Sequence, residues 1–474
     1  MGEVKGFLKY KRQDVRKRLV EERIKDFREL GLPLTPDEIN QQAARCMDCG
    51  IPFCHGVGCP LKNSIPDINE LIYKGRWEQA CEHLHWTNNF PEITGRVCPA
   101  PCEAACTLSI NDEPVLIRHI EYQIVERGFE EGWIKPLLAT KKTGKRIAVI
   151  GSGPAGLTAA QQLARAGHDV VVFEKDERAG GLLRYGIPDF KLEKHIIDRR
   201  LKQLTVEGIE FQMGVNVGED ISVRYLHKMF DCICLAMGSR QPRDLAVAGR
   251  EYENILFATE FLTAQNRLCA GESIGNSRTV TARDKVVVVI GGGDTGSDCV
   301  GTARRQEAKE IYQLEILPKP PETRPPDTPW PMWPRIMRMS SSHEEGCERQ
   351  WSVMTKKFVG AGDRVEQLHG CEVEWIKNPD GWKLKELPGT DFVLKADLVI
   401  LALGFVHVVH DGLIRDLGLQ LDEQGNVAVH NYQTSQPLIF AAGDTISGAS
   451  LAVSAIKSGR EAAAAIDRSL GGKN

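Results

Sequence analysis

The sequence predicts an α/β protein in which an α-helical, cysteine-rich region precedes two units built on parallel sheets, one inserted in the other. Three observations predict this arrangement. Eight of the 14 cysteines lie between residues 46 and 106, and two apolar runs further on are each followed by a glycine-rich turn and a helix. A chain of 474 residues is also too long for one core and suggests two to four domains.

The overall composition argues against several classes of protein. The formal net charge of −4 disfavours a dedicated nucleic-acid-binding protein. No run approaches 18 apolar residues, and the basic N-terminus has no apolar segment behind it, so we expect neither a membrane-spanning nor a secreted chain. In a cytoplasmic protein, clustered cysteines bind metal more often than they form disulfides.

The first 140 residues are expected to be helical. Apolar residues recur at roughly helical spacing from Lys9 to Leu30, which predicts an amphipathic helix that covers the protein's own core or docks a partner. Thr35-Pro36-Asp37-Glu38 looks like the cap and first turn of another helix. Further helices are expected at residues 67–84 and 117–127, and a basic, turn-rich connection at 136–144 marks the first boundary.

Seven of the clustered cysteines form two groups with the spacing of metal ligands. Zinc is one interpretation, since a Cys-x2-Cys pair is a normal zinc knuckle and a zinc site needs only four ligands. Iron–sulfur clusters are favoured because there are seven thiolates rather than four or eight, two precede proline, and a predicted flavin domain follows. The groups are Cys46-x2-Cys49-x4-Cys54-x4-Cys59-Pro60 and Cys98-Pro99-x2-Cys102-x3-Cys106.

The stretch from residue 146 to 175 is typical of a Rossmann-like cradle for flavin adenine dinucleotide. Gly151 permits a tight turn after an apolar strand, Gly153 lets the backbone approach a pyrophosphate, and Gly156 lets helix and strand pack closely. Glu174 ends the next strand, 23 residues after Gly151, where a carboxylate binds a ribose hydroxyl. A merely structural turn is the alternative. The residues expected at this cofactor are Gly151, Gly153, Pro154, Ala155, Gly156, Glu174 and Lys175.

A glycine-dense run at residues 180–188 follows the second strand and suggests backbone lying close to a ring system, although an ordinary surface turn is the alternative. Two later apolar strands end in Gly238 and in Gly443-Asp444. Asp444 is expected to hold the ribityl or pyrophosphate end of the flavin rather than only to cap its segment. The further residues expected at the flavin are Gly181, Leu182, Gly186, Gly238, Gly443 and Asp444.

A second strand, glycine turn and helix begins at residue 286 and implies a second dinucleotide, NADPH or NADH. Glu315 lies 24 residues after Gly291 and matches Glu174 in position. A carboxylate there favours a ribose 2′-hydroxyl and slightly favours NADH, although nearby cations could outweigh it. Residues 317–334 then hold eight prolines, a stiff excursion. The residues expected at this nucleotide are Gly291, Gly293, Asp294, Thr295, Gly296, Glu315 and Gly404, the last resembling Gly238.

These boundaries predict three domains. Residues 1–140 form a helical domain with two 4Fe-4S clusters, residues 141–254 and 405–474 bind FAD, and the inserted residues 255–404 bind NAD(P)H.

The two cysteine groups, together with residues 151–156, 181–191, 291–298 and 443–459, resemble the family of glutamate synthase small (β) subunits. Relatives of that family include the N-terminal half of dihydropyrimidine dehydrogenase. The resemblance implies an oxidoreductase of glutamate biosynthesis. Its flavin accepts a hydride from a nicotinamide nucleotide and passes electrons singly to two 4Fe-4S clusters. A large subunit then makes glutamate from glutamine and 2-oxoglutarate.

The resemblance also bears on the eighth ligand that two 4Fe-4S clusters require. In the related dehydrogenase family one cluster takes a non-cysteine ligand, and its place, aligned on Pro114, falls at Glu121 here. Cys81, in a predicted helix outside both groups, is the competing candidate. The same analogy implies one cluster on Cys46, Cys49, Cys54 and Glu121, and another on Cys59, Cys98, Cys102 and Cys106.

Two other functions remain open from the residues alone. A ferredoxin:NAD(P) oxidoreductase of the same flavin family differs only in its partner, whereas a thioredoxin-type reductase is disfavoured because Cys299 has no second cysteine at the required spacing. A zinc-stapled interaction module on an inactive nucleotide fold is the alternative from another class. No nucleophile constellation stands out, so no catalytic side chain is assigned.

Overall fold

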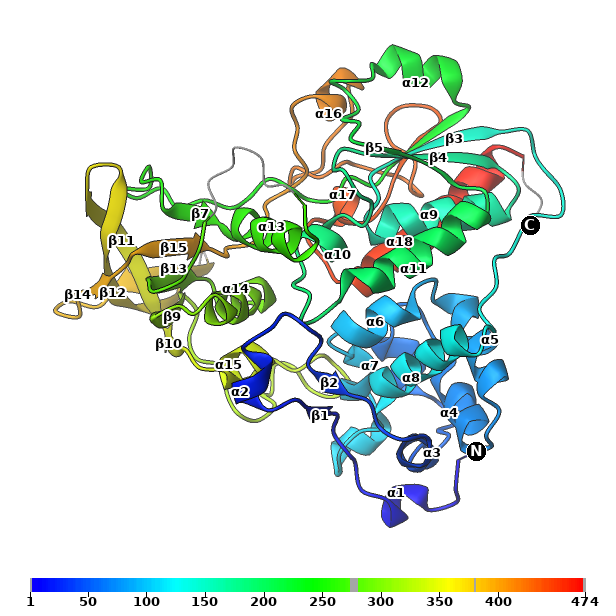
Figure 1. The fold of residues 1–474 in the computed structure, drawn as a ribbon, viewed down its shortest axis with the longest axis horizontal. Coiled ribbons are helices and arrows are strands. Elements are labelled where there is room, and N and C mark those ends of the chain that lie inside the picture. The colour runs from blue at the N-terminus through cyan, green and yellow to red at the C-terminus, as the bar shows by residue number, and fades with distance from the viewer. Residues whose placement is uncertain (1, 273–279, 379–380, 472–474) are drawn as a thin grey trace.

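The N-terminal part of the chain is helical beyond residue 35. The computed structural model describes residues 2–272, 280–378 and 381–471, and these helices lie beside two sheet-based units (Figure 1). Thr35 caps α3 as expected, because its hydroxyl accepts from the Glu38 N–H while the Glu38 carboxylate accepts from the Thr35 N–H. The helices and turns are α3 (Pro36–Ala44), η1 (Cys54–Gly58), α4 (Ile65–Tyr73), α5 (Trp77–Thr87), α6 (Pro91–Val97), α7 (Pro101–Ala104), η2 (Thr107–Ile110) and α8 (Ile117–Glu130).

Two helix predictions for this part are wrong. Instead of one helix from Lys9 to Leu30, the chain forms α1 (Gly6–Lys9), β1 (Arg16–Lys17), α2 (Val20–Arg23) and β2 (Gly31–Leu32), with β1 and β2 antiparallel. The side chains of this segment bond to distant parts of the chain, and such tertiary contacts override local periodicity. The helix expected at 67–84 is broken into α4 and α5, because Gly75 adopts a φ of 71° between them.

The flavin unit is a parallel sheet with strand order β16-β6-β3-β4-β5. Its central strand β3 (Arg146–Ile150) is apolar after Arg146 and buried there, as a strand covered on both faces must be. A Cβ on Gly459 of α18 would lie 2.3 Å from the Ala155 carbonyl oxygen of α9, so these helices meet through their backbones. The other elements are α9 (Pro154–Arg165), β4 (Asp169–Glu174), α10 (Leu182–Tyr185), α11 (Lys194–Val206), β5 (Glu210–Met213), α12 (Val223–Met229), β6 (Cys232–Leu235), α16 (Leu413–Asp416), β16 (Ile439–Ala441), α17 (Asp444–Ser447) and α18 (Ala452–Ser469).

The second parallel sheet has strand order β10-β9-β8-β15-β7 and is inserted between β6 and β16. The two connecting segments run side by side, since the Arg243 N–H donates to the Gly404 carbonyl at 3.0 Å and the Val406 N–H to the Gln241 carbonyl at 2.8 Å. Its elements are β7 (Ile255–Phe257), α13 (Ala258–Cys269), β8 (Val286–Ile290), α14 (Asp294–Arg305), β9 (Glu310–Glu315), α15 (Ser341–Glu344), β10 (Glu348–Trp351) and β15 (Leu398–Leu401).

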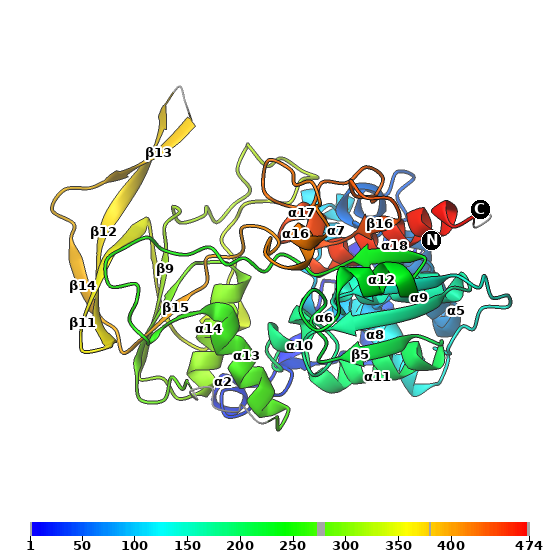
Figure 2. The same ribbon diagram turned by 90° about the horizontal axis from the view of Figure 1, so that it is seen from above.

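An antiparallel sheet that the sequence analysis did not anticipate lies within the insert. It comprises β11 (Val353–Ala361), β12 (Arg364–Asn378), β13 (Gly381–Glu386) and β14 (Phe392–Lys395), with β12 pairing with each of the others. Figure 2 shows that it projects from the nucleotide sheet, away from the cluster and flavin units. It therefore contributes no wall to the site described below.

Buried ion pairs fasten the units to one another. Glu92 of α6 and Arg200 of α11 form two hydrogen bonds of 2.7 Å with almost no exposed side-chain surface. Glu345, which follows α15, accepts from Arg305 at 2.6 Å and from Arg23 at 2.7 Å, and all three side chains are at most 2% exposed. The second network ties the N-terminal segment to the inserted unit.

Among the described residues, no helix combines the length and the apolar character needed to cross a membrane.

Replacing Glu345 with alanine leaves two buried guanidinium groups without their shared carboxylate. We expect the free energy of unfolding to fall by about 3–5 kcal/mol, the usual cost of removing one partner from a buried pair. Glu344→Ala is the matched control, because the Glu344 side chain is 35% exposed and its loss should cost about 1 kcal/mol or less. Equal shifts of the urea midpoint in the two variants would contradict this prediction.

Candidate functional site

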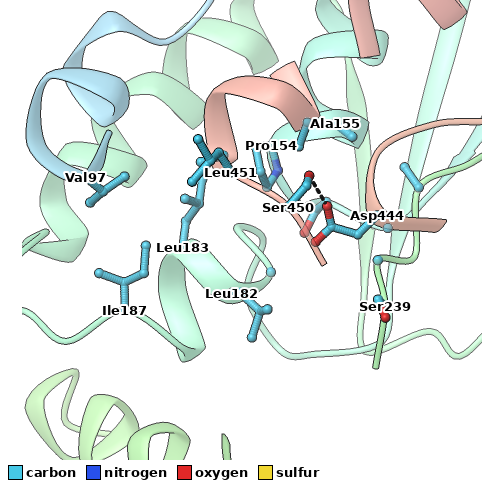
Figure 3. Close-up of a pocket in the computed structure, with 18 of the residues that line it drawn as sticks. Val97, Pro154, Ala155, Leu182, Leu183, Ile187, Ser239, Asp444, Ser450 and Leu451 are labelled. Carbon is cyan, nitrogen blue, oxygen red and sulfur yellow. Dashed lines mark hydrogen bonds between the residues drawn. The ribbon is translucent and has the colours of Figure 1, made fainter. Parts of the chain in front are cut away.

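A cavity of about 980 Å³ lies where the three parts of the chain meet. Such a volume is at the upper end of ligand sites and suits a dinucleotide with part of a second one. Figure 3 shows side chains from all around it, with Val97, Leu183, Ile187 and Leu451 facing the open space. The cavity therefore combines an apolar wall with the glycine turn of the flavin unit.

The first glycine turn has the shape that a pyrophosphate requires. A Cβ on Gly151 would lie 2.4 Å from the Ala236 carbonyl oxygen, and one on Gly156 would lie 1.9 Å from the Gly151 carbonyl oxygen, so both positions need glycine for packing. A Cβ on Gly153 would meet no protein atom and would project into open space. Pro154 opens α9, whose first N–H groups point toward this space. The turn thus fits the dinucleotide expected there.

Glu174 lies beside this turn, buried at the end of β4. Its carboxylate accepts from the Ser152 N–H at 3.1 Å and also from the Ser152 hydroxyl. That hydroxyl in turn accepts from the Gly180 N–H at 2.9 Å, which ties the glycine-dense run to the first turn. Gly181, with a φ of 52°, comes next and borders the cavity together with Glu174, Lys175 and Leu182.

Asp444, the first residue of α17, also lines the large cavity. Its carboxylate accepts from the Ser450 hydroxyl at 2.6 Å (Figure 3), and burial raises its pKa above the usual range. Thr445 accepts from the Gly238 N–H at 3.0 Å, which holds the ends of β6 and β16 together. Gly443 and Gly186 do not line the cavity themselves, because Gly443 packs on Ala155 and Gly186 packs on Leu182.

The second glycine turn has the same construction. Glu315 accepts from the Gly292 N–H at 2.7 Å, as Glu174 does from Ser152. Asp294 and Thr295, at the start of α14, line the cavity, whereas Gly291 and Gly296 serve packing against Ala402 and Gln313. Of the other expected residues, Gly293 directly precedes α14, Gly404 has a φ of 78°, and Glu315 lies at the end of β9, all outside the cavity wall.

A partly buried ion pair joins the flavin half of the cavity to the nucleotide half. Lys191, after the glycine-dense run, contacts Asp298 of α14, and both side chains line the cavity. Burial alone would lower the pKa of Lys191, but the Asp298 carboxylate raises it above its ordinary value. A lysine ammonium paired with a carboxylate therefore lies between the two halves of the cavity.

The cavity also has walls that sequence reasoning missed. The N-terminal segment contributes Val15, Lys17 and residues 29–31, and α8 contributes Arg118 and Tyr122. No local pattern marks these residues as ligand contacts. The N-terminal ones were hidden because the segment was interpreted as a helix, and only the long-range packing brings them to the flavin unit.

The seven grouped cysteines and Glu121 surround two small cavities, which we call the outer and inner cavities. Each cavity takes cysteines from both sequence groups. The outer cavity is lined by Cys46, Cys49, Cys54 and Cys106, and the inner cavity by Cys59, Cys98, Cys102 and Glu121. Cys81 lines neither and lies instead near His85, with 3.7 Å between its sulfur and Nδ1.

This grouping corrects the pairing expected from the resemblance, in which Glu121 and Cys106 stood in each other's places. The short helix α7 turns the chain so that Cys102 faces the inner cavity while Cys106 leaves toward the outer one. Glu121, in the second turn of α8, accepts from the Asn63 amide at 2.8 Å, and Asn63 follows Cys59. The carboxylate is thereby held in the inner cavity.

The chemistry of these side chains fits iron–sulfur clusters. Burial raises the pKa of Cys54 and Cys59 to about 12 and that of Glu121 to about 7, so buried thiolates and a buried carboxylate need a cation to stabilise them. Within the described part of the chain, no three His, Cys, Asp or Glu side chains lie close enough to hold one metal ion. Ligands spread around a cavity suit a multinuclear cluster better than a zinc ion.

The inner cavity shares a wall with the large cavity. Cys98 and Arg118 line both, and Arg118 donates to the Cys98 carbonyl at 3.0 Å. Neither residue lines the outer cavity, and no residue of the outer cavity borders the large one. Among the described residues, the inner cavity therefore shares a wall with the large cavity, and the outer cavity does not.

Comparison with protein families agrees with this division. Residues 145–459 match the pyridine nucleotide-disulphide oxidoreductase family, and residues 23–133 match the 4Fe-4S cluster domain II of dihydropyrimidine dehydrogenase. The first match makes the chain an oxidoreductase that uses FAD and NAD(P)H. The second identifies the cysteine region as an iron–sulfur domain rather than a zinc-binding one.

Individual relatives match over the whole chain. The glutamate synthase [NADPH] small chain of Mycobacterium tuberculosis is 52% identical over 100% of this chain and 97% of its own length. That of Bacillus subtilis is 43% identical over 100% and 99%. Glutamate synthase [NADH] of Schizosaccharomyces pombe is 44% identical over 100% of this chain, which spans 23% of that longer protein.

A solved structure, the oxidoreductase FprA of Mycobacterium tuberculosis, shares the fold. It has a TM-score of 0.57 at 18% identity and covers 69% of this chain and 85% of its own. The full-length relatives carry the assignment, and the chain belongs to the family of glutamate synthase small chains.

Proposed function

We propose that this chain is the electron-input subunit of a glutamate synthase, which oxidises NADPH and delivers electrons to a large subunit that makes glutamate from glutamine and 2-oxoglutarate. The observation that carries the proposal is the shared wall of Cys98 and Arg118 between the large and inner cavities. When bound, the flavin takes an electron pair from the nucleotide and releases electrons singly, as 4Fe-4S clusters carry them.

The proposed cofactor sites follow the domains expected from the sequence. Residues 1–140 hold two clusters, residues 141–254 with 405–474 hold FAD, and residues 255–404 hold the nucleotide. In the flavin site, the α9 N-terminus and the Gly153 backbone bind the pyrophosphate, and Asp444 orients the ribityl end. The inner cluster is held by Cys59, Cys98, Cys102 and Glu121, and the outer one by Cys46, Cys49, Cys54 and Cys106.

Lys191 and Asp298 are proposed to align the two cofactors. The Lys191 ammonium favours the electron-rich form of a flavin beside it, because it offers a positive charge in a site shielded from water. Asp298 fixes the direction of that ammonium and partly balances its charge.

We propose NADPH as the donor, although Glu315 alone predicts NADH. Both oxygens of the Glu315 carboxylate already accept backbone N–H groups, from Gly292 and Leu317. Trp351, the partner of Glu315 in the neighbouring strand, carries Arg349 and Lys319 over its ring at 4.7 and 5.6 Å. These two cations supply positive charge for a 2′-phosphate, and the small-chain relatives are named for NADPH.

The decisive experiment measures two activities of the purified protein. The chain alone should oxidise NADPH with ferricyanide as acceptor, at a lower KM than with NADH, and should produce no glutamate from glutamine. Addition of the large subunit should start glutamate formation. Reduction of ferredoxin with no response to the large subunit would instead indicate a ferredoxin:NAD(P) oxidoreductase, and a lower KM for NADH would restore the expectation from Glu315.

Gly153→Val should remove the flavin without disturbing the fold. A Cβ at this position meets no protein atom, the side chain projects into the space assigned to the pyrophosphate, and the backbone φ of −68° suits valine. We expect flavin absorbance to fall by at least about tenfold, the loss given by about 1.4 kcal/mol of clash. Circular dichroism and iron content should stay near wild type, and a variant with full flavin content would disprove the placement.

Glu121→Ala should remove or alter the inner cluster, because the variant leaves that cavity with three ligands. Cys81→Ser is the matched control, since Cys81 is equally buried in the cluster domain but lines neither cavity. Iron content and paramagnetic resonance of the reduced protein should show one cluster changed in the first variant and both intact in the second. The reverse pattern would assign the eighth ligand to Cys81.

A further inference from the structure

The proline-rich excursion between β9 and α15 reaches from the nucleotide unit to the outer cavity. The Trp330 indole N–H donates to the Cys106 carbonyl at 3.3 Å, and its ring centroid lies 4.6 Å from that of Phe53. Arg324 donates to the Ala104 carbonyl at 3.3 Å. The excursion thus touches both of the chain segments that carry outer-cavity cysteines.

These contacts lie directly beside ligand positions. Phe53 stands between Pro52 and Cys54, and both of these residues line the outer cavity, as Cys106 does. The inner cavity, by contrast, is closed by the flavin unit, which contributes Val453 of α18 to its wall. Trp330 does not line the outer cavity itself, so the excursion covers that cavity from outside, through Phe53 and the Cys106 carbonyl.

The excursion is held in a fixed shape. Arg324 donates to the Thr328 carbonyl at 3.0 Å and to the Met332 carbonyl at 2.6 Å, which closes the chain into a loop around Trp330. At its start the Leu317 N–H donates to Glu315, and at its end Ser340 caps α15 through the His343 N–H at 3.3 Å. The prolines stiffen what lies between. The loop that carries Trp330 is therefore already held in shape, and the indole is kept in contact with the Cys106 carbonyl.

We propose that Trp330 is a positioning residue for the outer cluster, on which it acts as a lid. The proposal rests on the proposed function, because it requires a cluster in the outer cavity. The indole N–H orients the peptide that carries Cys106, and the ring on Phe53 keeps water and chelators from the cluster. Partners beyond the direct ligands, and the exclusion of solvent, govern how firmly a cluster is held. The lid belongs to the nucleotide unit, so the outer cluster depends on a domain that supplies none of its ligands.

The test compares Trp330→Ala with Trp330→Phe in the full chain. We expect the alanine variant to lose its outer cluster to an iron(II) chelator on the order of tenfold faster than wild type. Losing a side chain that supports metal ligands weakens metal binding by about that factor. Trp330→Phe keeps the ring contact with Phe53, so this variant should lose the outer cluster at a rate between those of wild type and Trp330→Ala. Trp382→Ala is the control, because Trp382 is 64% exposed on the projecting sheet.

Paramagnetic resonance of the reduced protein identifies the cluster that is lost, since the outer signal is the one that Glu121→Ala leaves unchanged. Flavin content and the inner signal should persist in both Trp330 variants. Wild-type loss rates in Trp330→Ala, or equal loss of both clusters, would overturn the lid. A wild-type chain that binds no clusters would instead overturn the proposed function.

Discussion

The buried ion pair of Glu92 and Arg200 helps to fix where the cluster domain lies on the flavin unit. The pair joins α6 to α11 with two hydrogen bonds and is shielded from solvent, and Arg200 also donates to the Gln203 side chain at 2.7 Å. Asn89 adds a hydrogen bond of 2.7 Å to Gln161 of α9. Cys98 follows α6 directly, so the helix that carries Glu92 also brings the inner cavity to the flavin site.

The cluster domain and the flavin unit share one apolar core, and buried charged contacts between the units add to it. A buried ion pair adds little net stability compared with apolar packing, but a misplaced one is costly. The networks of Glu92 and Glu345 therefore act mainly to exclude other arrangements of the units. Such selection matters here because electrons pass only between centres held close together. The N-terminal segment also helps to hold the units together, since it contacts α15 through Arg23 and lines the large cavity.

The arrangement of the sites follows from chain topology. The nucleotide unit is inserted between β6 and β16 of the flavin unit, and the two connecting segments run together, so both glycine turns open toward one cavity. Each cluster cavity takes cysteines from both sequence groups, and Cys98 lies on the wall that the inner cavity shares with the large one. The excursion with Trp330 returns from the nucleotide unit to the segments that carry the outer-cavity cysteines. The inserted unit thereby contributes to the wall of the large cavity and also contacts the cluster domain beside the outer cavity.

The sequence by itself determined the local features of the structure, which depend only on residues that are close together in the chain. The glycine turns at 151 and 291, the strands before them, the Thr35 cap and the cysteine spacing are local, because sterics and hydrogen bonds within a few residues dictate them. The tertiary structure decided the rest. Residues 9–30 have helical periodicity, yet Arg23 binds Glu345 more than 300 positions away. The pairing of Glu121 with Cys59, the Lys191–Asp298 contact and the sheet of β11 to β14 likewise join residues whose proximity depends on the whole fold.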